Sequence, residues 1–240
     1  MDKKAILILL IILIAVTAFY LWGETKIPQD KEGVEEFVAY YEGNQMERAI
    51  TEYLLNQKQF SWKTKDNSQN FCVVESLDPE KELFPLYFWT YCGEYILDGD
   101  WVKTLSGSSG PVKIDYPNEL SFYNPNRFSY EAPGDGSHYS EDIKIIFPEL
   151  VQERIFNFDR KEIISRAEKI AFINMMSWEL IKSAINNCEA ESIFQAHNRN
   201  VAAELKNGEK LFFIEPQIDD IFELVKSAEP RCGKILMATE

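Results

Sequence analysis

The first strongly patterned segment of the chain is Ala5–Trp22, a run of eighteen residues in which Thr17 is the only polar member. As a helix, such a run spans about 27 Å, close to the ~30 Å hydrocarbon core of a bilayer. Two aromatic residues end the run, where aromatic rings favour the membrane interface. The pattern therefore predicts a transmembrane anchor over residues 1–22, followed by a polar tether over residues 23–32.

Lys3 and Lys4 lie in the short tail before this run, which favours a cytoplasmic N-terminus and an extracytoplasmic remainder. A cleaved signal peptide is the alternative, with Val16-Thr17-Ala18 as the cleavage site. The apolar run continues past that site to Trp22, which favours the uncleaved anchor. The chain is therefore predicted to be a single-pass membrane protein whose bulk is extracytoplasmic. In this respect it resembles the class of single-anchor bacterial envelope proteins.

Residues 33–150 change from helical to strand-like hydrophobic spacing. Apolar residues recur at helical intervals over Gln45–Gln57, which predicts a helix there after a first helix over Val34–Tyr41. Short apolar and aromatic runs then predict strands over 71–74, 84–92, 101–105, 112–116, 120–123 and 143–147. The segments Gly107–Pro111 and Pro133–Gly136 have turn composition. This order predicts an α+β domain that resembles the cystatin-like folds, with a helix packed across a curved antiparallel sheet.

Residues 160–240 return to the helical period. Lys161–Met176 is predicted as one helix, with Ser177 as the N-cap of the next. Two strand-like runs flank Asn207-Gly208, a sequence typical of a type I′ hairpin. A further helix begins near Ile218, and a short strand follows over residues 235–238. The segment is therefore predicted to be a second, smaller α+β domain.

Part of this second domain resembles a known family. The motif Ser177-Trp178-Glu179 opens a helix, Leu205-Lys206-Asn207-Gly208 forms a hairpin, and Pro216 precedes an acidic helix. The same order occurs in the extracytoplasmic domain of the FtsH family of membrane-anchored, ATP-dependent metalloproteases. The likeness covers about a fifth of the chain, and the family's nucleotide-binding and zinc-protease motifs are absent from the sequence. The resemblance implies a small scaffold and interaction domain beside a membrane.

The net charge of the chain argues against one class of partner, the nucleic acids. The chain has 25 Lys and Arg against 39 Asp and Glu, a net charge of -14. Binding to nucleic acid needs a basic face, so we expect no nucleic-acid partner. With 45% hydrophobic and 13% aromatic residues, the chain can bury a core and is not predicted to be disordered as a whole.

The four cysteines all follow the predicted anchor: Cys72, Cys92, Cys188 and Cys232. An oxidising compartment would allow two disulfides, for which the sequence permits three pairings. The local choice joins Cys72 to Cys92 and Cys188 to Cys232. Four reduced, buried thiols are the alternative.

Three aromatic residues share one face of a predicted strand: Trp89, Tyr91 and Tyr95. They form either a binding platform or, as the more favoured interpretation, a stripe of the core. Asp98-Gly99-Asp100 and Asp135-Gly136-Ser137 carry oxygen ligands suited to calcium, but neither continues into a calcium-loop pattern. We therefore interpret both as turns and predict no metal and no cofactor.

No catalytic residue is predicted. Cys92 with His138 or His197 would supply a thiol and a base, but a Cys72–Cys92 bond would remove that nucleophile. The favoured hypothesis is a non-enzymatic, membrane-anchored extracytoplasmic protein that binds a protein or cell-wall partner. The alternatives are a Cys/His-dependent hydrolase of envelope substrates and a periplasmic binder of small molecules or cations.

Overall fold

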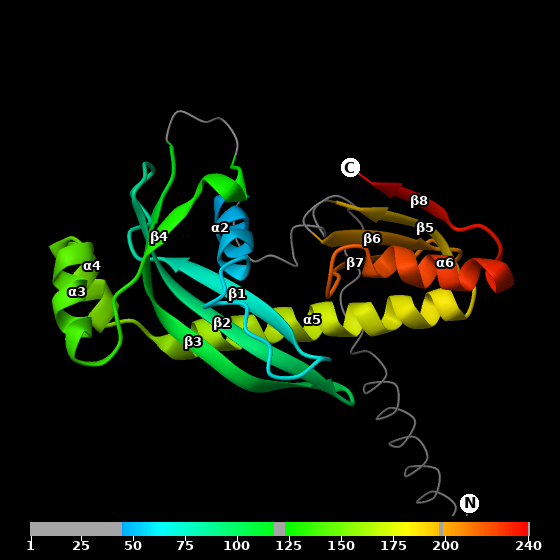
Figure 1. The fold of residues 1–240 in the computed structure, drawn as a ribbon, viewed down its shortest axis with the longest axis horizontal. Coiled ribbons are helices and arrows are strands. Elements are labelled where there is room, and N and C mark those ends of the chain that lie inside the picture. Colours follow the sequence, from blue (N-terminus) through cyan, green and yellow to red (C-terminus); the bar gives the residue numbers. More distant parts are fainter. Residues whose placement is uncertain (1–44, 118–122, 197–198, 240) are drawn as a thin grey trace, which may run out of the picture. The chain divides into compact units, whose positions relative to one another are not determined.

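The computed structural model describes residues 45–117, 123–196 and 199–239, all within one compact unit (Figure 1). The helices are α2 (Gln45–Leu55), α3 (Tyr139–Ile146), α4 (Glu149–Phe156), α5 (Arg160–Asn186) and α6 (Asp220–Cys232), with short 3-10 turns at Pro125–Arg127 and Gly136–His138. Sheet A has the order β1 (Gln69–Ser76), β2 (Leu86–Asp98), β3 (Trp101–Asp115) and β4 (Ser129–Glu131). Sheet B has the order β7 (Lys210–Ile214), β6 (Asn200–Leu205), β5 (Ala190–Gln195) and β8 (Leu236–Thr239). The predicted α+β class is confirmed.

The predicted anchor, the tether and the helix expected over Val34–Tyr41 lie outside the described residues, as does most of the strand expected over residues 120–123. Within the described ranges, no helix has both the length and the apolar character needed to cross a bilayer.

Sheet A is an antiparallel meander with helices on both faces. On one face, α2 contributes Ile50 and Leu54 to a core with Phe88 of β2. On the other face, Trp89 and its neighbours on β2 pack against α5 and α4. Because side chains alternate along a strand, the long aromatic strand β2 supplies both cores. Neither face of the sheet centre is left open to solvent.

β3 differs from the prediction, because the segment Gly107–Pro111 is not a turn. It lies inside one continuous strand, and each of its residues pairs with β2. A Cβ added to Gly107 would come within 2.7 Å of the Tyr91 hydroxyl. The missing side chain therefore makes room for the Tyr91 ring, and the pairing with β2 overrides the local turn composition.

The strand predicted over residues 143–147 is instead part of helix α3. Ile143 is fully buried, and Tyr139 and Ile146 pack against the same core. Their spacing is that of a helix, so the short apolar run at its end was a misleading signal for a strand.

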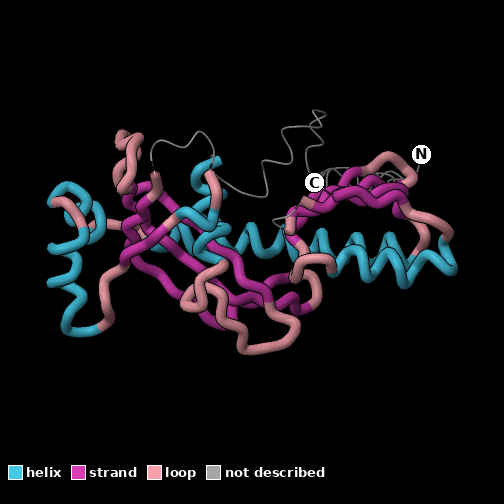
Figure 2. Tube along the Cα trace, turned by 45° about the horizontal axis from the view of Figure 1, so that its top comes forward, coloured by secondary structure: helices cyan, strands magenta, loops and turns pink. Residues whose placement is uncertain are grey.

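The predicted break at Ser177 is also wrong. α5 runs unbroken for 27 residues and contacts β1 and β2 of sheet A as well as β7 of sheet B (Figure 2). Ser177 is buried within the helix, and Trp178 continues its apolar stripe. The predicted boundary between two domains, at residues 150–160, remains a prediction.

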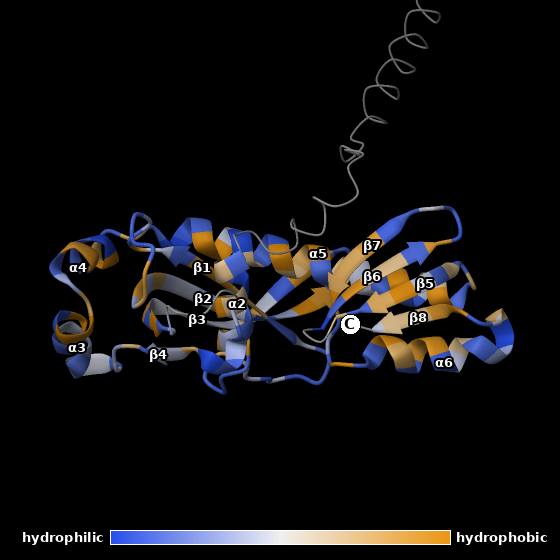
Figure 3. Cartoon of the chain, turned by 90° about the horizontal axis from the view of Figure 1, so that it is seen from above, coloured by the Kyte–Doolittle hydropathy of each residue, from blue (hydrophilic) through white to orange (hydrophobic). Residues whose placement is uncertain are grey.

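Sheet B packs one face against α5 and α6. Trp178 and Ile181 of α5 meet Val225 of α6 and Phe213 of β7 in a single core. Figure 3 shows that both helices carry hydrophobic and hydrophilic residues, and their buried residues form the stripe that packs on sheet B. The predicted hairpin joins β6 to β7, and the predicted last strand is β8, parallel to β5.

The turn of this hairpin differs from the type I′ expectation. Gly208 has a φ of 84°, whereas Asn207 is not among the described residues with positive φ. The Gly208 N–H donates to the carbonyl of Leu205, and the Leu205 N–H donates to that of Glu209. One left-handed glycine at the end of a three-residue loop is typical of a type I turn with a bulge.

Both local cysteine pairs are disulfides, Cys72–Cys92 and Cys188–Cys232. Cys72 and Cys92 are directly opposite each other on β1 and β2. The second bond ties the segment after α5 to the end of α6. The alternative of four reduced thiols is wrong.

Candidate functional site

The outer edge of β3 is open over most of its length. On its inner side β3 pairs with β2 from Trp101 to Ile114, but on its outer side β4 pairs only with Lys113–Asp115. In the part of the chain that the structure describes, no other strand pairs with β3. The stretch Trp101–Val112 therefore presents backbone N–H and C=O groups that could accept an added strand.

A groove of about 800 Å³ lies at the β4 end of this edge. Ser108–Val112 of β3 form one wall, and Tyr130–Asp135 form the other, with Gln59 and Phe60 also lining the space. The side chains of β3 are small here, and a Cβ added to Gly110 would meet no atom within 4 Å. The groove thus results from the same Gly-Ser-Ser-Gly-Pro segment that has turn composition.

Two tryptophans hold the serines of β3 in place. The Trp89 indole N–H donates to Ser109 Oγ at 2.9 Å, and the Trp62 indole N–H donates to Ser106 Oγ at 2.7 Å. Ser106 Oγ in turn donates to the Glu94 carboxylate at 3.0 Å. The open edge is therefore fixed from inside the fold, which lowers the entropy lost when a ligand binds.

The carboxylate of Glu94 connects several of these groups, and its side chain has no exposed surface. Its carboxylate also accepts hydrogen bonds from the hydroxyl and backbone N–H of Thr64 and from Ser68 Oγ. Burial by itself raises the pKa of Glu94, but the hydrogen bonds outweigh it and lower the pKa to about 2. Glu94 is thus ionised at neutral pH and holds the segment around Thr64 and Ser68 against the sheet.

The ionisable side chains that line the groove are acidic, apart from two tyrosines. Glu131 and Asp135 lie on the wall opposite β3. Lys113 is close to the groove, but it forms ion pairs with Glu131 at 3.1 Å and with Asp115 at 3.6 Å. Together with the net charge of -14, this distribution favours a ligand with basic side chains over an acidic one.

The structure places Trp89, Tyr91 and Tyr95 in the core between sheet A and α5, with exposures of 1%, 7% and 0%. They are the core stripe of the favoured interpretation and do not form a surface platform. Trp89 also stacks on Phe158, with ring centroids 4.5 Å apart. Its indole N–H donates to Ser109 and so links this stripe to the open edge of β3.

The proposed thiol and base are not brought together. Cys92 is bonded to Cys72 and has no free thiol, so the Cys/His hydrolase alternative loses its nucleophile. His138 is exposed in the turn before α3, and His197 lies outside the described residues.

The two candidate calcium segments lie in turns. Asp98-Gly99-Asp100 connects β2 to β3, with Gly99 at a φ of 66°, and Asp135 precedes the turn that contains His138. Over the described ranges, no three His, Cys, Asp or Glu side chains are grouped as a metal site.

The sequence interpretation missed the open edge and its groove. The available signal was the run of small residues between two strand-like segments, but it could not be told from a turn without knowing that β2 is equally long. The likenesses to the FtsH and cystatin-like folds remain predictions, because the chain matches no protein-family model, no curated protein and no solved structure.

Proposed function

We propose that this protein is a membrane-anchored, extracytoplasmic binding protein that holds an extended segment of a partner protein as an added strand on β3. The observation that carries the proposal is the open edge at Trp101–Val112, beside the groove that the small residues of β3 leave. Addition of a strand to such an edge is a common mode of peptide recognition, in which backbone hydrogen bonds provide affinity and pockets provide selectivity.

The groove supplies the selective part. Space above Gly110 accommodates a side chain of the added strand, and the acidic wall formed by Glu131 and Asp135 favours lysine or arginine at that point. An added strand of about five or six residues would follow the line of β4 along β3.

Two features support the location. Ala5–Trp22 is long and apolar enough for the predicted anchor, and both cysteine pairs are disulfides, as is common outside the cytoplasm. An anchor would hold the open edge near the membrane surface and raise its effective concentration toward partners there.

To test the proposal, a library of random heptapeptides is selected for binding to the full-length protein in detergent. Selected peptides should be enriched in lysine and arginine and should bind at least ten-fold more weakly to Gly110→Val, which adds bulk where an added Cβ meets no atom within 4 Å. Ser192→Val on β5 is the matched control and should bind normally.

N-methylation of the peptide backbone gives the second readout. Strand addition uses alternate amides of the ligand, so methylating one alternate set should abolish binding and methylating the other should not. Equal effects of the two sets, or full affinity for Gly110→Val, would contradict the proposal.

A further inference from the structure

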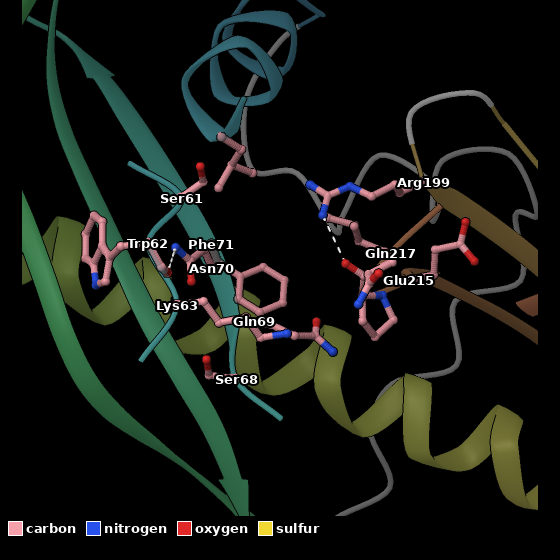
Figure 4. Close-up of a pocket in the computed structure, with 13 residues that line it drawn as sticks. Ser61, Trp62, Lys63, Ser68, Gln69, Asn70, Phe71, Arg199, Glu215 and Gln217 are labelled. Atoms are coloured by element: carbon pink, nitrogen blue, oxygen red, sulfur yellow. Dashed lines mark hydrogen bonds between the residues drawn. The ribbon is translucent and has the colours of Figure 1, made fainter. Parts of the chain in front are cut away.

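A second pocket has a volume of about 230 Å³. One wall consists of Ser61–Lys63, in the loop after α2, and Ser68–Phe71, at the start of β1. The other wall consists of Arg199, just before β6, and Ile214–Gln217, from the end of β7 onward (Figure 4). This pocket shares no lining residue with the β3 groove.

Two cations line this pocket in a chain that is otherwise strongly acidic: Lys63 and Arg199. One guanidinium nitrogen of Arg199 donates to the carbonyl of Pro216 at 3.3 Å, which fixes the planar group at the pocket wall. An arginine fork has five N–H donors, so further donors remain to bind a planar anion at two points.

The backbone of Arg199 is held in an unusual conformation. Its φ is 66°, in the left-handed region that costs a non-glycine residue free energy, and its carbonyl accepts the Glu215 N–H at 3.0 Å. Such outliers persist where the surrounding structure fixes them, and they cluster at binding sites.

The acidic groups around the pocket limit the charge of a ligand. The Glu215 carboxylate is fully buried and accepts from Gln195 Nε2 and from the backbone N–H groups of Asp219 and Ile221. Its oxygens are occupied, so it is poorly placed to pair with Arg199. The Asp220 carboxylate accepts the Gln217 N–H at 2.9 Å. The Glu215 carboxylate in the lining and the Asp220 carboxylate bonded to Gln217 offset the charge of the two cations, which disfavours a ligand with two negative charges.

The rest of the lining is mixed. Ser61, Ser68, Gln69, Asn70 and Gln217 contribute polar groups, whereas Leu55, Phe71, Ile214 and Pro216 contribute apolar surface, and the volume is below the 300–1,000 Å³ that is usual for drug-sized ligands. A ligand of this size has a small apolar body beside its charged group.

We infer that this pocket binds a small monocarboxylate with an apolar side group, with the Arg199 guanidinium on the carboxylate and Lys63 as the second cation. The inference does not depend on the β3 edge, since the two sites are separate. A free acid and the C-terminus of a peptide present the same carboxylate chemistry, and the experiment distinguishes them.

The experiment titrates the full-length protein in detergent with N-acetyl-leucine, its amide, a tetrapeptide ending in leucine, and inorganic phosphate, and follows binding by calorimetry. Saturable binding of N-acetyl-leucine or of the tetrapeptide, with at least ten-fold weaker binding of the amide and of phosphate, would support the inference. Tighter binding of the tetrapeptide would identify a chain end as the source, and tighter binding of N-acetyl-leucine would identify a free acid.

Arg199→Asn is the decisive variant, because asparagine tolerates a left-handed φ and removes the guanidinium. It should weaken carboxylate binding at least ten-fold with an unchanged melting temperature, and Lys63→Gln should weaken it less. Lys206→Gln, on the hairpin between β6 and β7, is the matched control and should bind like the natural chain.

Three results would overturn the inference: equal binding of the acid and its amide, full affinity for Arg199→Asn, or no saturable binding of either carboxylate up to about 10 mM, beyond even a weak, millimolar Kd. Failure here would leave peptide binding at β3 unaffected, so the two proposals are tested separately.

Discussion

Glu94 in β2 of sheet A and Glu215, which directly follows β7 of sheet B, both have no exposed surface, yet the pKa shifts of the two carboxyl groups have opposite signs. Glu94 has a pKa lowered to about 2. Burial raises the pKa of Glu215, and hydrogen bonds from Ile221, Gln195 and Asp219 oppose that rise without cancelling it. Burial costs both carboxylates solvation, so the hydrogen bonds decide the sign.

The opposite pKa shifts of Glu94 and Glu215 reflect the different hydrogen bonds that the two carboxylates accept. Glu94 gathers two serines and a threonine from distant segments and therefore acts as an ionised cross-link beneath the open edge of β3. Glu215 mainly satisfies the first N–H groups of α6, a task in which a neutral amide oxygen can replace a carboxylate oxygen.

Loss of the disulfides should give the largest destabilisation in each of the two regions. The Cys188–Cys232 bond spans 44 residues, whereas the Cys72–Cys92 bond spans 20. Each disulfide lowers the chain entropy of the unfolded state. Replacing Cys188 and Cys232 by serines should therefore lower the free energy of unfolding by about 4 kcal/mol, and replacing Cys72 and Cys92 should lower it by about 3 kcal/mol. Urea unfolding of the two double variants measures both, and a larger loss for Cys72→Ser with Cys92→Ser would reverse this ranking.

Glu94→Gln should destabilise the protein by about 3 kcal/mol at neutral pH, because an amide cannot accept all the hydrogen bonds that the carboxylate accepts. Glu215→Gln should cost only about 1 kcal/mol, because relief of the buried charge offsets the loss of one of its two acceptor oxygens. Thermal melts of the pair test the contrast directly, and equal losses would remove it.

The pH dependence separates the same two groups. The folded pKa of Glu94, about 2, lies below its ordinary value of 4.5, so its contribution is present above about pH 5 and is lost as the pH falls toward 2. The shift corresponds to about 3 kcal/mol, which Glu94→Gln should remove from the acid limb of a stability–pH curve.

Glu215 has the opposite sign. Its folded pKa is raised, so stability falls as the pH rises from the unfolded pKa through the folded one. Glu215→Gln should abolish that fall, and an unchanged slope in either variant would show that the assigned group is not responsible.

Substitutions of single glycines should change the stability of the two regions by smaller amounts. Gly107→Ala in sheet A should cost about 2 kcal/mol, because the new Cβ meets the Tyr91 hydroxyl. Gly208→Ala in the hairpin of sheet B should cost about 1 kcal/mol, because its φ is 84°. Gly110→Ala has open space and is the control, expected within about 0.5 kcal/mol of the natural chain. Melting temperatures rank the three, and a loss at Gly110 as large as at Gly107 would contradict the open groove.

The sequence was sufficient for features that depend on near neighbours. The periodicity of α2 and the hairpin around Gly208 follow from spacing over a few residues, and the local disulfide pairing was the favoured one of the three that the sequence permits. Sequence reasoning failed where distant contacts override local preference. Gly107–Pro111 has turn composition, but its pairing with β2 makes it strand, and Ser177 has the chemistry of an N-cap but is buried inside α5.

The two candidate sites could not be predicted from the sequence, because they also depend on contacts between distant segments. No spacing rule links Lys63 to Arg199, which only the folded chain brings to one pocket. The β3 groove likewise depends on how far β4 extends, and β4 is only three residues long. The stripe of Trp89, Tyr91 and Tyr95 could be recognised because alternation along one strand is local.

α5 also limits how the protein can be shortened. Its side chains complete the core of sheet A with Ile163, Ala167 and Ile170 and that of sheet B with Ile181 and Ile185. A fragment that stops before Arg160 would expose the part of the aromatic face of β2 that α5 covers and would be prone to aggregation. Useful truncations for further work must therefore keep this helix whole.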